Sequence, residues 1–273
     1  MQLDTPFSCA SVALQTADDD AFTRRTINAP PQLRMPKVSL VIPTLNEAEN
    51  LRRLLPRLPN WVSEILIVDG RSTDATIEVA RSVRPDVRVV LEPRSGKGVA
   101  LMTGFEAAEG DVIVMLDADG SMNPEEIISF VAALMSGADF VKGSRFIQGA
   151  GTIDMTTVRM LGNWALTLAV RTLYGGSFSD LCYGYIAFWK KHLPVLRADC
   201  PGFEVETMLN IRALKSHLKI VEVASFESLR LHGESNLHAL PDGWRIAKTI
   251  IKERLPGHLM APQPIVSDAV KHQ

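Results

Sequence analysis

A repeating order of strand segments and helical segments constrains the fold of this chain more than any other feature of its sequence. Four short apolar segments are each followed by a segment whose apolar residues recur at helical spacing. The strand segments are 38–42, 64–68, 87–91 and 112–116, and the helical segments are 51–58, 75–83, 99–108 and 124–135. Four such units in succession predict an α/β fold, with a Rossmann-like, mostly parallel sheet and helices on both faces.

The order of elements is less regular after residue 139, where we expect a smaller region beside the sheet. Residues 1–36 mix Ser, Thr, Pro and an acidic run without sustained periodicity, which indicates a flexible extension. The folded domain is therefore predicted at 37–255, and a polar tail at 256–273 follows it. Strands are expected at 139–142, 183–189 and 219–224, and helices at 156–174, 205–217 and 243–253.

The charge and cysteine content argue against several classes of function. A formal net charge of -2 gives no broad attraction for polyanions, so nucleic-acid binding is not expected. The three cysteines form no CxxC pair, which argues against a disulfide framework or a zinc site and suits the reducing cytoplasm. The sequence has no segment of the ~20 apolar residues that span a bilayer. We therefore expect a cytoplasmic protein.

Polar residues directly follow each of the first four strand segments. In a doubly wound sheet, ligands bind beyond the carboxyl ends of the strands, so these residues are the first candidates for a functional site. They are Pro-Thr-Leu-Asn-Glu at 43–47, Asp-Gly-Arg-Ser-Thr-Asp at 69–74, Arg-Ser-Gly-Lys-Gly at 94–98 and Asp-Ala-Asp at 117–119. One edge of the predicted sheet therefore collects carboxylates, glycines and cations.

Asp117 and Asp119 are the most specific of these candidates. Two carboxylates two residues apart can share a hard divalent ion with the oxygens of a diphosphate. The alternative is a solvated turn in which one Asp caps the helix that follows. We favour the metal site, because a buried apolar strand leads into the pair and a helix begins soon after it.

Lys97 lies between Gly96 and Gly98, where its ammonium group and the backbone N–H groups of a glycine-rich turn can meet a phosphate. The turn lacks the spacing and the final Ser or Thr of a P-loop, and it lacks the third glycine of a dinucleotide fingerprint. Both features argue against kinases and nicotinamide-dependent dehydrogenases. Asp69 either accepts hydrogen bonds from a base or ribose or caps the turn that follows it.

The same motifs, taken in order along the chain, resemble the inverting glycosyltransferases of family 2. The series is completed by Gly-Ser-Arg at 143–145 and Asp-Leu-Cys-Tyr-Gly-Tyr at 180–185, and the likeness covers residues 38–254. Within that family the chain is most similar to the branch of dolichol-phosphate mannosyltransferases and polyprenyl-phosphate glycosyltransferases. The resemblance implies a GT-A fold, in which the first half binds the nucleotide and the second half binds the acceptor.

The resemblance assigns several of these residues to the sugar donor. The residues implied to hold the nucleoside are Pro43, Asn46, Glu47 and Asp69. The residues implied to bind Mn²⁺ or Mg²⁺ and the diphosphate are Asp117 and Asp119, with phosphate contacts from Lys97 and Arg145. Two positions depart from the family, because Gly70-Arg71 stands where a second Asp is usual and Ser121 stands where the branch often has Gln.

Residues from the second half are implied to serve the acceptor and the chemistry. Arg159 and Asp180 would line the acceptor side, and His232 is a candidate for a further metal ligand. The residues implied to carry catalysis are Asp119, Asp180 and Arg145.

The predicted function is metal-dependent, inverting transfer of a sugar from a nucleotide-diphosphate donor, such as GDP-mannose or UDP-glucose, to a polyprenyl phosphate. A phosphate acceptor is ionised at neutral pH, because its second pKa is about 6, and it needs no strong general base. A soluble hydroxyl acceptor, such as a specialised metabolite or a sugar acid, would need one. The carboxylates available for that role are Asp180, Glu204 and Glu206. A NAD-dependent oxidoreductase and a nucleotidyltransferase are less favoured alternatives.

The final helical segment is both apolar and basic. Its apolar residues include Trp244, Ile246, Ile250 and Ile251, and its basic residues are Arg245, Lys248, Lys252 and Arg254. This composition suits either a peripheral contact with a membrane surface or packing onto the domain.

Overall fold

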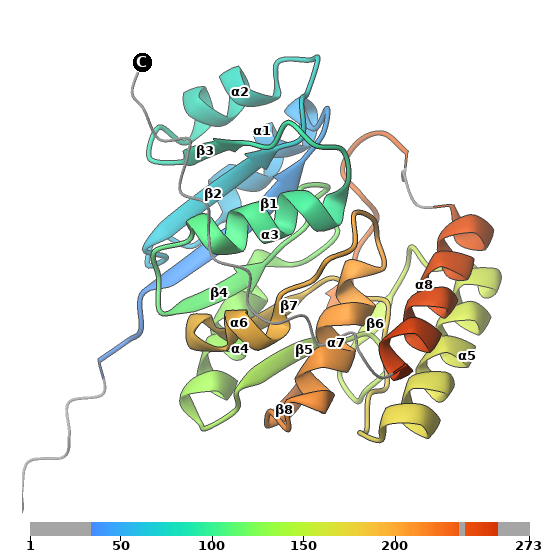
Figure 1. Cartoon of the computed structure of the whole chain (residues 1–273). Helices are drawn as coiled ribbons and strands as arrows, with labels where there is room; N and C mark the ends of the chain where they lie inside the picture. Colours follow the sequence, from blue (N-terminus) through green and yellow to red (C-terminus); the bar gives the residue numbers. More distant parts are fainter. Residues whose placement is uncertain (1–33, 235–237, 256–273) are drawn as a thin grey trace, which may run out of the picture. The chain divides into compact units, whose positions relative to one another are not determined.

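The computed structural model describes residues 34–234 and 238–255, whose arrangement is shown in Figure 1. From Pro36 onward they belong to one compact unit. The predicted extension at 1–36 lies outside the described residues apart from its last three positions, and the predicted tail at 256–273 lies wholly outside them.

A seven-stranded sheet forms the centre of this unit (Figure 1). Its spatial order is β3-β2-β1-β4-β7-β5-β8, and its strands are parallel except β7, which is antiparallel to both β4 and β5. This order confirms the predicted mostly parallel α/β fold. The strands are β1 (Val38–Thr44), β2 (Glu64–Asp69), β3 (Arg88–Leu91), β4 (Val112–Met115), β5 (Phe140–Ser144), β7 (Ile186–Trp189) and β8 (Ile220–Ala224).

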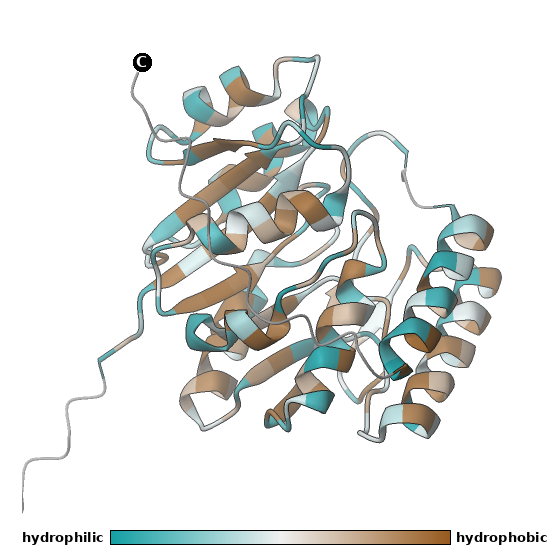
Figure 2. Cartoon of the chain, in the orientation of Figure 1, coloured by the Kyte–Doolittle hydropathy of each residue, from teal (hydrophilic) through white to brown (hydrophobic). Residues whose placement is uncertain are grey.

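Helices cover both faces of the sheet, as the sequence predicts. Leu40 of β1 packs on one side in the same apolar cluster as Leu51, whereas Val41 packs on the other side with Phe105. Because both faces of the central strands are buried, these strands are continuously apolar rather than alternating, as Figure 2 shows. One face carries α1 (Ala48–Leu54), α2 (Thr76–Val83) and α4 (Ile127–Met135), and the other carries α3 (Lys97–Ala107), α6 (Leu193–Leu196) and α7 (Val205–Lys215).

Two further helices, α5 (Thr157–Tyr174) and α8 (Ala239–Arg254), lie side by side next to α7 (Figure 1). A third apolar cluster joins the three helices and includes Ile246 and Ile250 of α8. These two residues are therefore used in packing, whereas Trp244 and Ile251 of the same helix are exposed. The α8 helix begins four residues before the predicted start, because Pro241 is tolerated in a first turn, whose N–H groups have no intrahelical partner.

The remaining elements are short. A small parallel sheet pairs β6 (Gly151–Thr152) with β9 (Phe226–Glu227), and two-residue strands of this kind have no periodicity that a sequence could reveal. The strand predicted at 183–189 begins only at Ile186, because the Tyr183 carbonyl accepts a hydrogen bond from the Lys142 ammonium group. Three 3-10 helices, η1 (Leu55–Arg57), η2 (Pro124–Glu126) and η3 (Lys190–His192), complete the described part of the chain.

The sheet reverses its order of growth between β1 and β4. From β1 the chain proceeds through β2 to β3 on one side, and it then returns to place β4 on the other side of β1. At such a switch point the segments that leave neighbouring strands diverge, which opens a crevice beyond their carboxyl ends. The predicted site segments 43–47 and 117–119 leave the sheet at this crevice.

Candidate active site

A cleft of about 350 Å³ opens at the switch point. The first half of the chain contributes the segments that follow β1 and β4 and the start of α3, and the second half contributes residues that include Gly202, Phe203, Glu206, Glu227 and Arg230. Both halves therefore form the walls of one site. The predicted site residues that line it are Pro43, Glu47, Lys97, Asp117, Asp119, Arg159 and Glu206.

Lys97 joins the first Asp of the pair to the second half of the chain. Its ammonium nitrogen lies 2.7 Å from Asp117 Oδ1 and 2.8 Å from Glu206 Oε1. Burial alone would lower the pKa of Lys97, but the charges of the two carboxylates outweigh it and raise the pKa above its usual range. Burial raises the pKa of Asp117 to about 6, with Lys97 opposing this shift and Glu206 and Asp119 adding to it. Lys97 is thus held as a cation between two acids.

Arg230 stands beside the second Asp of the pair. Its Nη2 atom lies 3.6 Å from Asp119 Oδ2 and 3.4 Å from Glu47 Oε1. Its Nε atom is buried and has no hydrogen-bond partner among the described residues. Burial raises the pKa of Glu47, as expected for a carboxylate whose cationic neighbour is only loosely engaged.

The charges around the Asp pair suit a divalent cation. The four carboxylates of Glu47, Asp117, Asp119 and Glu206 face the two cations Lys97 and Arg230, which leaves a formal charge of -2. Within residues 34–234 and 238–255, His, Cys, Asp and Glu side chains form no group of three with the spacing of a metal site. The oxygen donors of Asp117 and Asp119 fit Mg²⁺ or Mn²⁺, which commonly bind through one or two carboxylates plus substrate phosphates.

The glycines on either side of Lys97 serve packing in this structure. A Cβ at Gly96 would lie 2.1 Å from the Pro201 carbonyl oxygen, and one at Gly98 would lie 2.2 Å from that of Cys200. The Gly98 N–H also donates to the Pro201 carbonyl, at 2.8 Å. This N–H is therefore already engaged within the protein. Of the two phosphate contacts predicted for this turn, the Lys97 ammonium group is better placed than the Gly98 N–H.

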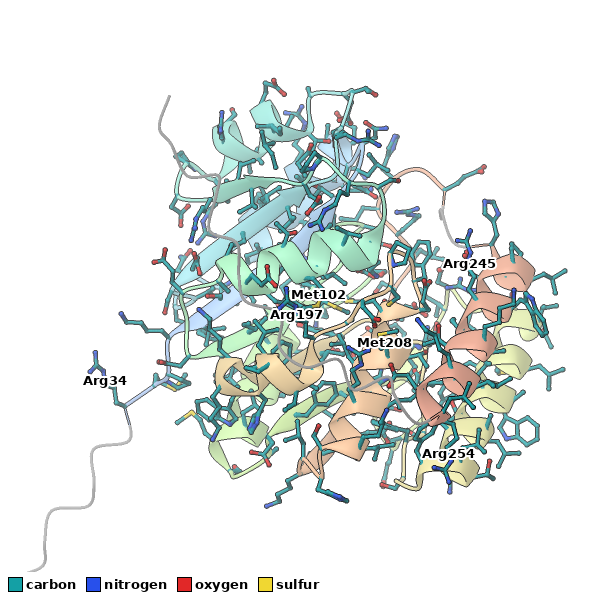
Figure 3. The ribbon with its side chains drawn as sticks, in the orientation of Figure 1. Arg34, Met102, Arg197, Met208, Arg245 and Arg254 are labelled. Carbon is teal, nitrogen blue, oxygen red and sulfur yellow. The ribbon has the colours of Figure 1, made fainter. Side chains whose placement is uncertain are left out.

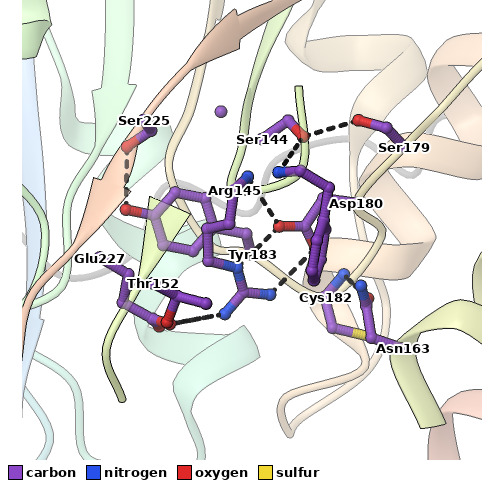
Figure 4. A network of polar contacts seen from close by, with 12 residues as sticks. Ser144, Arg145, Thr152, Asn163, Ser179, Asp180, Cys182, Tyr183, Ser225 and Glu227 are labelled. Atoms are coloured by element: carbon purple, nitrogen blue, oxygen red, sulfur yellow. Dashed lines mark hydrogen bonds and ion pairs between the residues drawn. The ribbon is translucent and has the colours of Figure 1, made fainter. Parts of the chain in front are cut away.

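Arg145 and Asp180 are buried inside the protein, and Figure 4 shows the network of polar contacts to which they belong. Arg145 Nε lies 2.7 Å from Asp180 Oδ2, and Arg145 Nη1 lies 3.0 Å from both carboxylate oxygens of Glu227. The Arg145 side chain is only 2% exposed, and that of Asp180 is fully buried. Neither residue lines the cleft, in contrast to the phosphate contact predicted for Arg145 and the acceptor contact predicted for Asp180.

The network also disfavours Asp180 as a general base. Burial would raise the pKa of Asp180, but its hydrogen bonds and ion pair with Arg145 outweigh burial and lower the pKa. Glu204 does not line the cleft either, and its Oε1 atom accepts a hydrogen bond from the Gly202 N–H at 3.3 Å. Of the three carboxylates predicted as bases for a hydroxyl acceptor, only Glu206 therefore lines the cleft.

Three other predicted residues lie near the cleft without lining it. Asn46 Oδ1 accepts a hydrogen bond from the Thr73 N–H at 2.8 Å, and Asp69 Oδ2 accepts one from the Ser72 N–H at 2.9 Å. Asn46 ties together the two turns that flank the cleft, Asp69 closes its own turn, and Gly70 lines the cleft in place of Asp69. His232 is exposed, so its role as a metal ligand stays a prediction.

The sequence analysis missed two basic residues of the cleft. Arg230 lies two positions before the His232 that the sequence singled out, and Arg245 lies in the final helical segment that we read as a surface feature. Isolated arginines carry no spacing signal. Arg230 reaches the cleft because its segment folds back onto the first half, and Arg245 reaches it because α8 packs against α5 and α7. A phosphate needs such cations, so their convergence with Lys97 and Arg159 is an added indication of a phosphorylated ligand.

A doubly wound sheet with paired acids and basic side chains at its switch point is the architecture of an enzyme that binds a phosphorylated nucleotide. The comparison with known families places the chain more closely. Residues 39–193, more than half of the chain, match the model of glycosyl transferase family 2. The chain therefore belongs to glycosyltransferase family 2, which confirms the predicted family and enzyme class.

Named relatives are consistent with the predicted branch. A dolichol-phosphate mannosyltransferase of Pyrococcus furiosus is 32% identical over 210 residues, which cover 74% of this chain and 59% of the relative. The chain thus spans less than two thirds of that protein's length. An undecaprenyl-phosphate mannosyltransferase of Micrococcus luteus is 32% identical over 213 residues, which cover 74% of this chain and 87% of the relative.

Solved structures confirm the GT-A fold. The glucosyl-3-phosphoglycerate synthase of Mycobacterium tuberculosis, in complex with Mn²⁺, UDP and glucosyl-3-phosphoglycerate, matches with a TM-score of 0.65 and 25% identity. The match covers 80% of each chain. The same enzyme with phosphoglyceric acid matches with a TM-score of 0.64 and 26% identity, over 80% of each chain. The Mn²⁺ in the first complex agrees with the predicted cofactor, Mn²⁺ or Mg²⁺.

Proposed function

We propose that this chain transfers a sugar from a nucleotide-diphosphate donor to a lipid phosphate, with the help of a divalent cation. The observation that carries the proposal is the meeting of Asp117, Asp119, Lys97 and Arg230 at the switch point of the sheet. These groups supply what the departure of a nucleoside diphosphate requires, namely carboxylates for a metal and cations for phosphate oxygens. The names of the dolichol-phosphate and undecaprenyl-phosphate mannosyltransferases support the lipid phosphate as acceptor, and the UDP and Mn²⁺ in a structural neighbour support the nucleotide donor and the metal.

The residues of the chain divide the work of binding the donor. Asp117 and Asp119 would hold Mn²⁺ or Mg²⁺, which, when bound, neutralises the charge that develops on the departing diphosphate. Lys97 and Arg230 would donate hydrogen bonds to the diphosphate, and Pro43, Glu47 and the turns held by Asn46 and Asp69 would flank the nucleoside. Arg145 and Asp180 would act from behind the cleft, by fixing Glu227 and Tyr183 in its wall.

We expect one class of nucleotide sugar to raise the melting temperature of the protein, and only when Mn²⁺ or Mg²⁺ is present. A ligand that binds only the folded state stabilises it by mass action, by about 2.7 kcal/mol at one hundred times its dissociation constant. A thermal-shift panel of GDP-, UDP- and dTDP-sugars, with each metal and with EDTA, measures this effect. A panel without any metal-dependent shift would contradict the proposed donor site.

Two basic residues of the cleft belong to helices that also carry exposed apolar side chains. Arg159, in the first turn of α5, and Arg245, in α8, both line the cleft, and Figure 3 shows Arg245 and Arg254 toward opposite ends of α8. We call the exposed side chains of these two helices the α5–α8 face. Its large apolar members are Val158, Met160, Leu161, Trp164, Leu168, Leu173, Leu240, Trp244 and Ile251.

The charges of the α5–α8 face favour an anionic lipid surface. Its exposed charged residues are all basic, namely Arg171, Arg245, Lys248, Lys252 and Arg254. The acids of the two helices, Asp242 and Glu253, are buried, and Glu253 is paired with Arg212 and Lys215. Among the described residues, no helix is both long and apolar enough to cross a membrane. Exposed apolar and basic side chains on two adjacent helices instead suit a protein that rests on the membrane surface, where a lipid phosphate is available.

We expect the protein to form a sugar-phosphate lipid from short-chain polyprenyl phosphates and to bind vesicles that contain anionic lipid. Each Lys at such a surface contributes about 1 kcal/mol, so Lys248→Gln with Lys252→Gln should weaken vesicle binding about 30-fold. Co-sedimentation with vesicles of anionic and of neutral lipid measures this effect. The matched control is Arg57→Gln with Arg81→Gln, which removes two exposed cations elsewhere.

A different product would identify a different acceptor. If a soluble hydroxyl compound receives the sugar and polyprenyl phosphates do not, the lipid acceptor is wrong and the donor site stands. Glu206 would then be the first candidate for a general base, since it is the predicted base that lines the cleft.

A further inference from the structure

The segment that carries Arg230 is fixed to the Asp pair through its backbone. The Leu231 N–H donates to the Asp119 carbonyl and the Ser228 N–H donates to the Ser121 carbonyl, each at 2.9 Å. Gly120, with a φ of 73°, leaves no room for a side chain, because a Cβ there would lie 2.3 Å from Leu231 Cδ1. We call residues 228–232 the strap.

Side chains of α1 hold the strap from the other side. Asn50 Nδ2 donates to the His232 carbonyl at 3.1 Å, and Arg53 Nη1 donates to the Leu231 carbonyl at 3.2 Å. The backbone of the strap is therefore anchored both to the segment of the Asp pair and to α1, and its position beside Asp119 is set by these hydrogen bonds.

The guanidinium of Arg230 donates from Nη1 to the Glu234 carbonyl, but its Nη2 atom is only loosely engaged by the two carboxylates. Its separations of 3.4 and 3.6 Å from Glu47 and Asp119 exceed the ~2.7–2.9 Å of a strong charge-assisted hydrogen bond. Its buried Nε atom lacks a partner among the described residues, and an unpaired buried donor costs free energy. A bound group with several acceptor oxygens would satisfy this guanidinium better than the two carboxylates do.

Lys97 and Arg230 each neutralise one carboxylate of the Asp pair. Lys97 lies 2.7 Å from Asp117, and Arg230 lies 3.6 Å from Asp119. A divalent cation would be drawn to the same two carboxylates, and two cations already beside them repel it. A diphosphate would attract both basic side chains and so free the carboxylates for the metal.

We infer that Arg230 makes metal binding conditional on the donor. In the absence of donor it neutralises Asp119 and weakens the binding of a divalent cation. When a nucleoside diphosphate binds, the guanidinium turns to the phosphate oxygens, and metal and diphosphate then strengthen each other's binding. This inference rests on the proposed donor site and adds to it an order of binding, in which the diphosphate precedes or accompanies the metal.

The Arg230→Met variant tests the inference through two changes of opposite sign. Without nucleotide it should bind Mn²⁺ about tenfold more tightly than the wild type, because a positive charge next to Asp119 is gone. With GDP or UDP and no metal it should bind the nucleotide about tenfold more weakly, because a phosphate donor is gone. Free Mn²⁺ measured by electron paramagnetic resonance and nucleotide binding measured by calorimetry give the two constants for the full chain.

The Arg53→Met variant is the matched control, because Arg53 contacts the same strap but neither carboxylate. It should bind Mn²⁺ with the same affinity as the wild type. Arg230→Lys keeps the positive charge, so it should bind Mn²⁺ as weakly as the wild type does. The inference is overturned if Arg230→Met binds Mn²⁺ no more tightly than the wild type, if neither protein binds Mn²⁺, or if Arg53→Met shows the same gain. Failure of both nucleotides to bind the wild type with Mn²⁺ would refute the proposed donor site instead, and the comparison with Mn²⁺ alone would still show whether Arg230 weakens metal binding.

Discussion

The Asp119→Asn variant is expected to lose sugar transfer while it keeps its fold. The amide has nearly the volume of the carboxylate but no charge with which to hold a divalent cation. Removal of a single electrostatic contact to a developing anion often costs 10²–10³ in rate, and loss of the metal affects every such contact. We therefore expect kcat/KM to fall by at least about 10³, which corresponds to about 4 kcal/mol of transition-state stabilisation.

Stability provides the control for this variant. The group around the Asp pair carries a formal charge of -2 from four carboxylates and two cations, so removal of one negative charge relieves repulsion. The melting temperature should be unchanged or higher, as measured by circular dichroism. Asp86→Asn makes the same chemical change at an exposed residue and should leave turnover normal. Near-normal turnover of Asp119→Asn would remove the metal from the proposed mechanism.

The Arg145→Met variant should lose stability rather than only donor binding. Arg145 is 2% exposed and pairs with Asp180 and Glu227, so its loss leaves two buried carboxylates without their hydrogen-bonded ion-pair partner. Breaking a buried ion pair in this way costs about 3–5 kcal/mol. Urea denaturation measures the free energy of unfolding, and Arg88→Met, which breaks partly exposed pairs with Glu64 and Glu109, should cost only ~1 kcal/mol or less.

The pH dependence of the folding stability provides a second test of the same network. The pKa of Asp180 is lowered in the folded protein, so its ionised form stabilises the fold. That stabilisation is complete above the unfolded pKa of about 3.9 and is lost as the pH falls through the lowered folded value. The stability difference between the wild type and Asp180→Asn should therefore shrink only in strong acid. If Arg145→Met kept wild-type stability and lost donor affinity, the predicted phosphate contact would be right and our structural role for Arg145 wrong.

Much of the site was predictable because parallel strands deliver their carboxyl ends to the same edge of a sheet. Lys97 and Asp117 belong to turns after neighbouring units, and the motif order alone places both at that edge. The structure joins them in an ion pair of 2.7 Å. Glu206 was also recognised, but as a residue of the acceptor side rather than as the partner of Lys97.

The contacts of Arg145 could not be predicted from its sequence motif. Gly-Ser-Arg ends β5 at the same edge of the sheet as the Asp pair, so a phosphate contact was a reasonable prediction. The guanidinium turns away because Glu227, 82 positions later, stands in the small β6–β9 sheet. Strands of two residues leave no trace in the sequence pattern, so this partner could not be anticipated.

The sequence by itself determined the order of strands and helices, their burial and the collection of acids and cations along one edge of the sheet. These properties follow from local periodicity and from the geometry of parallel strands, which act over a few residues at a time. Only the tertiary structure decided which charges neutralise one another. Arg230 meets Glu47 across 183 positions of the chain, and such a choice depends on how two distant segments fold together rather than on any local pattern.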